Sequence, residues 1–213
     1  MTVPADLTLL PLAPALALLV TGAVALLSGV AGGNTRTSGV IALLGLVVAS
    51  AFAGVNLAGA GAQPSFAFGL QWVTDAPAAG LAVAVLIGTL LAILIGWDAL
   101  EPAAMDRPEY YPLLLFAATG AMVMIHAGDF VVLVLGLEIL SLSVYALSAW
   151  RPHDRASEEA GMKYFLLGAF ASAILVYGVA LVYGATGAFS YTRVASALAE
   201  GGGSLALLGG ALV

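Results

Sequence analysis

Cysteine is absent from this chain of 213 residues, and histidine occurs only twice, at His126 and His153. The absence of cysteine excludes disulfide bonds and thiolate-bound iron–sulfur clusters. Two histidines are too few for us to expect a protein-ligated haem or zinc centre. We therefore expect no cofactor and no metal in this chain, and we expect any redox chemistry to take place in a partner.

Charge is also scarce. Only 8% of the residues are charged and 62% are hydrophobic, whereas a soluble domain carries roughly 25% charged residues. With a mean hydropathy of +1.09, this composition indicates an integral membrane protein. Six basic residues against twelve acidic ones exclude a nucleic-acid-binding surface and nucleic acid as a partner.

Apolar runs of membrane-spanning length recur along the chain and are separated by short polar breaks. They predict an all-α, polytopic transmembrane helix bundle that forms one domain over 1–213. The predicted helices lie near 7–28, 38–60, 77–97, 109–126, 130–150 and 158–184. A seventh apolar run begins near Ser204 and reaches Val213 after about half a span, so we expect the chain to be truncated.

The ends of the chain and the loops predict an orientation. The first apolar run carries only Asp6 and lacks the basic segment of a secretory signal sequence, so we expect a retained helix. Arg193 is the only basic residue in the even-numbered loops. Four arginines lie in the first, third and fifth loops: Arg36, Arg107, Arg151 and Arg155. Because basic loops remain in the cytoplasm, we expect the N-terminus outside.

Glu138 is a lone carboxylate within the apolar run 130–150, with eight residues of the run before it and twelve after it. At about 1.5 Å per residue, Glu138 lies near the middle of a membrane. A charge there costs at least about 2.5 kcal/mol, which makes this residue a candidate functional site. The structural alternative is a neutral carboxyl that is hydrogen-bonded to Ser141 or Ser143, one turn away.

Lys163 is the only lysine and lies about 8 Å inside the sixth predicted helix, whereas Glu138 lies about 18 Å from the same face. If these helices are antiparallel neighbours, a reaching lysine side chain comes within about 10 Å of Glu138. With an effective dielectric near 20, the attraction between the two charges is then about 1.7 kcal/mol. The cost of burying the charged carboxylate of Glu138 outweighs this attraction. The pair therefore predicts a proton relay in which the lysine tunes the glutamate. Snorkelling of Lys163 to the headgroups is the equally favoured alternative.

Three further polar residues have ordinary explanations. His126 and Asp129 flank the outer turn between the fourth and fifth predicted helices, where an interfacial position is favoured over a place on a proton path. Asp75 opens the third predicted helix, and a carboxylate at a helix N-terminus is electrostatically favourable.

The stretch 128–189 resembles the N-type antiporter-like membrane subunit of proton-pumping NADH:quinone oxidoreductase, complex I. GLEILSL around Glu138 and AGMKYFLLGAFASA around Lys163 carry the resemblance, and EYYPLLLFAATGAM at 109–122 extends it. Multisubunit sodium/proton antiporter subunits share the wider fold. The resemblance implies a fourteen-helix fold of two inverted repeats, of which this chain is the N-terminal portion. The family commonly has proline where this chain has Ser143, which leaves the bend of the fifth helix open.

The resemblance implies a non-redox, proton-translocating subunit, which is an enzyme only as part of the oxidoreductase complex. The family's fifth-helix glutamate and sixth-helix lysine fall on Glu138 and Lys163. The implied partners are the other membrane subunits of complex I and the lipid bilayer, with quinone reached only through the complex. The implied location is multi-pass in the inner (plasma) membrane of a bacterium. A sodium/proton antiporter subunit is one alternative, and a membrane scaffold with structural buried charges is the other.

Overall fold

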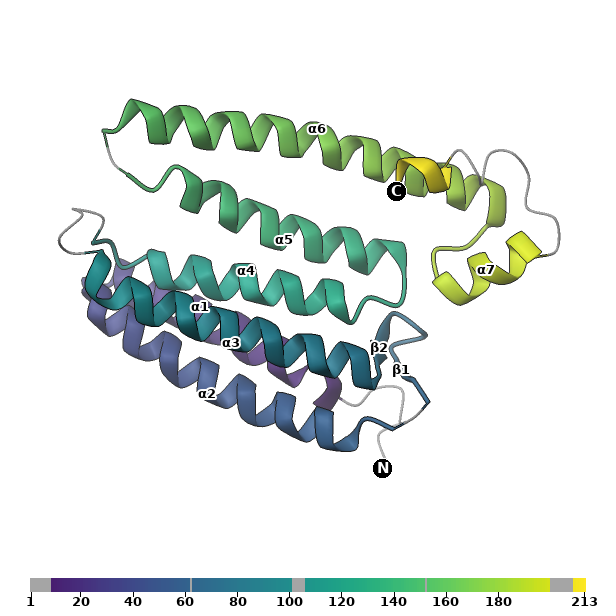
Figure 1. The fold of residues 1–213 in the computed structure, drawn as a ribbon, viewed down its shortest axis with the longest axis horizontal. Coiled ribbons are helices and arrows are strands. Elements are labelled where there is room, and N and C mark those ends of the chain that lie inside the picture. The colour runs from purple at the N-terminus through teal and green to yellow at the C-terminus, as the bar shows by residue number, and fades with distance from the viewer. Residues whose placement is uncertain (1–8, 62, 101–105, 152, 200–208) are drawn as a thin grey trace.

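The computed structural model describes residues 9–61, 63–100, 106–151, 153–199 and 209–213. Long helices run back and forth side by side, and each turn reverses the chain direction (Figure 1). The helices are α1 (Ala13–Val30), α2 (Thr35–Gly59), α3 (Ala76–Ala99), α4 (Tyr110–Ile125), α5 (Phe130–Ser148), α6 (Arg155–Thr186) and α7 (Tyr191–Ala199). The predicted fold class, an all-α transmembrane helix bundle, is confirmed.

Length and composition allow five of the described helices to cross a membrane, namely the 3₁₀ turn Leu10–Leu12 with α1, and α2, α3, α5 and α6. The apolar helix α4 is shorter, with 16 residues. Asp75, Asp129 and Asp154 begin α3, α5 and α6, and each carboxylate accepts a hydrogen bond from a backbone N–H of the first turn. These caps satisfy N–H groups that have no partner inside the helix. The cap at Asp154 explains why α6 starts at Arg155 rather than near 158.

The helices are packed unevenly. Helices α1 to α5 form the body of the bundle, and α6 lies along α5 as an outer layer (Figure 1). Glycines let α4 and α5 approach closely, because a Cβ on Gly120 would lie 2.4 Å from the backbone nitrogen of Leu140. A Cβ on Gly136 would lie 2.7 Å from the backbone nitrogen of Met124. The fifth helix is therefore held firmly on its α4 side and more loosely on its α6 side.

Two small elements were not predicted. Strands β1 (Ser65–Ala67) and β2 (Trp72–Thr74) form an antiparallel hairpin between α2 and α3. The short helix α7 follows α6 and buries only Val194. Both elements lie in the polar breaks between apolar runs, where hydropathy predicts no structure. The predicted start of a seventh helix at Ser204 lies outside the described residues, although residues 209–212 are helical.

Candidate functional site

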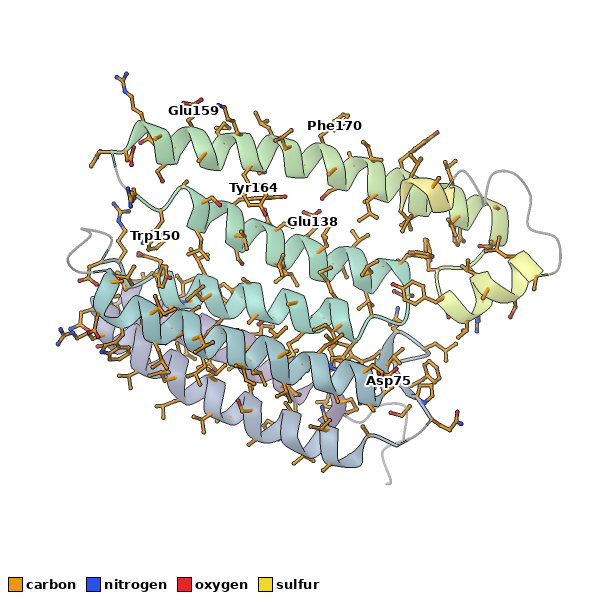
Figure 2. The ribbon with its side chains drawn as sticks, viewed as in Figure 1. Asp75, Glu138, Trp150, Glu159, Tyr164 and Phe170 are labelled. Atoms are coloured by element: carbon orange, nitrogen blue, oxygen red, sulfur yellow. The ribbon has the colours of Figure 1, made fainter. Side chains whose placement is uncertain are left out.

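Glu138 lies at the middle of α5, with eight residues of the helix before it and ten after it. Its side chain is half-buried and projects between α5 and α6 (Figure 2). No hydrogen bond or ion pair joins its carboxylate to any other residue that the structure describes. The site is thus a solitary acid in an apolar helix.

The serines near Glu138 differ in their bonding. The Ser143 hydroxyl donates to the Ile139 carbonyl at 2.9 Å, so in this arrangement it does not serve the carboxyl of Glu138. Ser141 makes no side-chain hydrogen bond to the described part of the chain. Of the two partners expected from the sequence, only Ser141 is available.

Lys163 forms an ion pair with Glu159, one turn earlier on α6, and both side chains are exposed, at 69% and 62%. Gly161 packs against Ala149, which marks the side of α6 that faces α5. Two residues correspond to about 200° around a helix, so Lys163 lies on nearly the opposite side of α6. The lysine expected beside Glu138 is instead engaged with Glu159.

The two charges lie at more similar depths than the sequence predicts, since their predicted levels differ by about 10 Å. The Ser157 hydroxyl donates to the Ser148 carbonyl at 3.2 Å, which puts these residues at one level. Lys163 lies six residues beyond Ser157, and Glu138 lies ten residues before Ser148. At about 1.5 Å per residue, the two charges differ in depth by about 6 Å. Their separation is therefore a matter of helix face rather than of depth.

Aromatic side chains face Glu138's helix where the lysine was expected. Tyr145 meets Tyr164 edge to face, with ring centroids 4.9 Å apart, and it meets Phe165 at 5.8 Å. A Cβ on Gly168 would overlap the Tyr145 hydroxyl, so this glycine makes room for the tyrosine. Figure 2 shows Tyr164 projecting from α6 into the same gap as Glu138. The sequence signal for Tyr145 was its position seven residues after Glu138, on the same helix face.

A cavity of about 400 Å³ is lined by α5 and α6, by Met124 of α4, and by Leu212 and Val213. Ser141 and Tyr145 line it from α5, and Gly168 and Ser172 line it from α6. Most of the remaining lining is apolar. Glu138 is not among the residues that line it.

His126 and Asp129 belong to a separate, buried junction at one end of the bundle, with exposures of 2% and 5%. The His126 Nδ1 lies 2.8 Å from the Val73 carbonyl, which can only accept, so Nδ1 carries the proton. Burial lowers the pKa of His126, while the bond to Val73 and the carboxylate of Asp75 act against that effect. These residues hold the hairpin against the α4–α5 turn. Within the described residues, no three His, Asp or Glu side chains gather as a metal site would require.

Residues 127–213 match the family described as "NADH:quinone oxidoreductase/Mrp antiporter, TM". That segment belongs to this family. Glu138 and Lys163 both lie within it. The resemblance that was inferred from the GLEILSL and AGMKYFLLGAFASA stretches is therefore confirmed.

Curated relatives extend the family match toward the N-terminus. The chain is 40% identical over 206 residues to "NADH-quinone oxidoreductase subunit N" of Rhodospirillum rubrum, covering 95% of this chain and 42% of the relative. It is 45% identical over 140 residues to the protein of the same name from Magnetococcus marinus, covering 66% and 29%. The chain thus spans less than half the length of these relatives.

A solved structure agrees with this relationship. The chain is similar to a chain of respiratory complex I from Thermus thermophilus, with a TM-score of 0.70 and 31% identity. The match covers 92% of this chain and 42% of the other.

Proposed function

We propose that this chain forms part of a non-redox, proton-translocating membrane subunit of a respiratory NADH:quinone oxidoreductase. The names of its relatives support this assignment, as do the shared helical fold and the family match across the segment that contains Glu138. Because the chain spans less than half of those relatives, the activity is proposed for the whole protein and not for this segment alone.

The observation that carries the proposal is the solitary carboxyl of Glu138 at the middle of α5. An ionised carboxylate at this depth costs at least about 2.5 kcal/mol, and no described side chain compensates that cost. The proposal assigns to this carboxyl the loading and release of a proton during turnover, because a mid-membrane acid without a partner is kept for a functional reason.

Lys163 acts on Glu138 in this proposal as a modulator and not as a bound partner. It lies at a similar depth but on the far side of α6, in an ion pair with Glu159. Any electrostatic effect of Lys163 on Glu138 is therefore exerted across α6. This effect changes when the lysine leaves its ion pair with Glu159. A pair of this kind can switch the field at Glu138 without touching it.

The environment proposed for the subunit is the inner membrane of a bacterium, with the N-terminus outside. Arg36, Arg107, Arg151 and Arg155 lie in or next to the loops at one end of the bundle, and Arg193 lies on α7 at the other end (Figure 1). This asymmetry supports a cytoplasmic location for the arginine-rich end. The proposed partners are the other membrane subunits of the complex, through which alone quinone is reached.

The test is Glu138→Gln in the full-length subunit within the intact complex. We expect the number of protons pumped per NADH oxidised to fall while the complex still assembles, because glutamine keeps the shape but carries no exchangeable acid. Glu158→Gln, at the exposed first turn of α6, is the matched control and should pump normally. Normal pumping by Glu138→Gln would contradict the proposal. If the subunit instead purified without dehydrogenase subunits and exchanged sodium for protons, it would be an antiporter component.

A further inference from the structure

A polar cavity of about 320 Å³ lies at the arginine-rich end of the bundle, far from Glu138. The start of α2, the end of α3 and the segment that leads into α4 meet at this end (Figure 1). Polar and charged side chains form much of the lining, unlike that of the apolar grooves along the helices. The lining includes Thr35, Arg36, Trp97, Leu100, Asp106 and Tyr111.

Two of the lining hydroxyl groups are buried and lack a partner. Thr35 is 6% exposed and Tyr111 is 2% exposed, and neither hydroxyl forms a hydrogen bond with the described part of the protein. A Cβ on Gly39 would lie 2.7 Å from the Trp97 ring and 2.9 Å from the Tyr111 ring, so this glycine makes room for both rings beside the cavity. A buried hydroxyl without a partner is costly, so these two groups indicate a polar ligand.

Two helix ends give the cavity electrostatic poles of opposite sign. Helix α2 begins at Thr35, and the N-terminal end of a helix carries roughly half a positive charge. Helix α3 ends beside the cavity with Leu100 as its C-cap, and the C-terminal end of a helix carries roughly half a negative charge. The lining side chains add one full charge of each sign, at Arg36 and Asp106.

We propose that this cavity binds the headgroup of phosphatidylethanolamine, with its phosphate at the start of α2 and its ammonium at Asp106 and the end of α3. The backbone N–H and the hydroxyl of Thr35 can both donate to a phosphate oxygen, as is usual at a helix N-terminus. An anion without an ammonium would lie beside the carboxylate of Asp106. A cation without a phosphate would lie beside Arg36 and the positive end of α2, so a zwitterion fits best.

The neighbouring surface favours a lipid over a soluble phosphate ester. An apolar groove of about 340 Å³ lies between the same two helices, with Leu46 of α2 and Leu86 of α3 in its lining. Leu46 follows Thr35 by eleven residues, and Leu86 precedes Trp97 by eleven. Eleven residues make about three turns and about 16 Å, so the groove continues the cavity along the same helix faces. An acyl chain attached to the bound headgroup can therefore lie in the groove.

The test is photo-crosslinking of lipid to the full-length subunit in the intact complex, reconstituted in phosphatidylcholine vesicles. Two probes carry the same diazirine-bearing acyl chain, one on phosphatidylethanolamine and the other on phosphatidylglycerol, and each is added in trace amounts to a separate sample. Phosphatidylglycerol shares the phosphate but has no ammonium for Asp106. Crosslinked residues are identified by mass, and labelling of the α2–α3 groove is divided by labelling of all other positions in the complex.

We expect the phosphatidylethanolamine probe to label the groove about three- to fivefold more strongly than the phosphatidylglycerol probe, which is the effect of one partly exposed charge pair. Asp106→Asn should abolish this preference. Asp98→Asn is the matched control and should keep it, because Asp98 is also exposed but does not line the cavity. Thr35→Val should weaken groove labelling by both probes, since it removes a donor to the phosphate that they share.

Equal labelling of the groove by the two probes in the parent would overturn the proposal, because the groove would then hold only the lipid that surrounds any membrane protein. A preference for phosphatidylglycerol would also overturn it. Adding phosphoethanolamine to the aqueous phase should leave groove labelling unchanged, and a loss of labelling would show that the site takes a soluble ester instead of a lipid. The parent comparison decides alone if Asp106→Asn fails to assemble, and none of these readouts depends on proton pumping.

Discussion

The imidazole of His126 stacks on the indole of Trp72, with ring centroids 4.8 Å apart and 15° between the ring planes. Around this pair, the backbone N–H of Val73 donates to the His126 carbonyl and that of Gly128 donates to the Gln71 carbonyl, both at 2.8 Å. The hairpin is thereby fastened to the turn from which α5 begins. The junction thus sets the starting point of the helix that carries Glu138.

This junction should loosen in acid. Burial lowers the pKa of His126 below its ordinary value of 6.5, so the folded junction binds fewer protons than the opened one between the two pKa values. Stability then rises with pH across that window, and it is lost as the pH falls from about 6.5 toward the lowered pKa. The carboxylate of Asp75 interacts electrostatically with His126. The carboxylate of Asp129 instead accepts a hydrogen bond from the backbone N–H of Val132, at the start of α5. We expect the amides of Val73 and Gly128 to exchange with solvent faster at about pH 5 than at about pH 8, relative to the intrinsic rates.

The matched variant for that measurement is His126→Gln, which cannot take up a proton in this range. Its hairpin amides should keep the same relative protection at both pH values. A parent protein with pH-independent protection, or a variant with the parent's pH dependence, would contradict the assignment to His126.

Gly128 is needed for the hairpin to dock. A Cβ at this position would lie 1.9 Å from the backbone carbonyl oxygen of Leu70, so Gly128→Ala must displace backbone. We expect a loss of about 1–3 kcal/mol, measured as a lower Tm of the purified protein. Gly184→Ala on α6 is the control, since its Cβ would meet nothing within 4 Å and alanine favours a helix. A tolerated Gly128→Ala would show that the hairpin is not held as described.

Lys163 and Glu159 offer a test of the modulator role. Their exposed pair should contribute no more than about 0.5 kcal/mol to stability, so Lys163→Ala should assemble normally. We expect Lys163→Ala to reduce pumping less than Glu138→Gln does. We also expect Lys163→Ala and Glu159→Gln to shift the pH profile of pumping in opposite directions, because one removes a positive charge and the other a negative charge. If Lys163→Ala pumps as the parent does at every pH, the lysine serves only its ion pair with Glu159.

Much of the fold is predictable from the sequence because a membrane restricts it to helices of spanning length. The apolar runs near 77–97 and 130–150 lie within two residues of α3 and α5 at each end. The hairpin is different: it depends on contacts between Trp72 and His126, which lie far apart in the sequence and meet only after α3 and α4 have packed. Hydropathy carries no information on such a contact.

The candidate site, like the fold, is predictable from the sequence only in part. Glu138 is conspicuous in the sequence because a carboxylate in an apolar run is costly wherever the helix packs. The partner of Lys163 was not predictable from depth alone, since rise per residue gives the level of a side chain and not the helix face that meets α5. Gly161 and Gly168, which pack on Ala149 and Tyr145, mark that face.

The central claim is that the carboxyl of Glu138 gains and loses a proton during turnover. Infrared difference spectra of the intact complex, recorded with and without NADH, test it most directly when parent and Glu138→Gln are compared. The account predicts a protonated-carboxyl band that changes with turnover in the parent and is missing from the variant. A parent spectrum identical to that of the variant, or a Glu138 that stays ionised throughout like a solvated carboxylate, would contradict it.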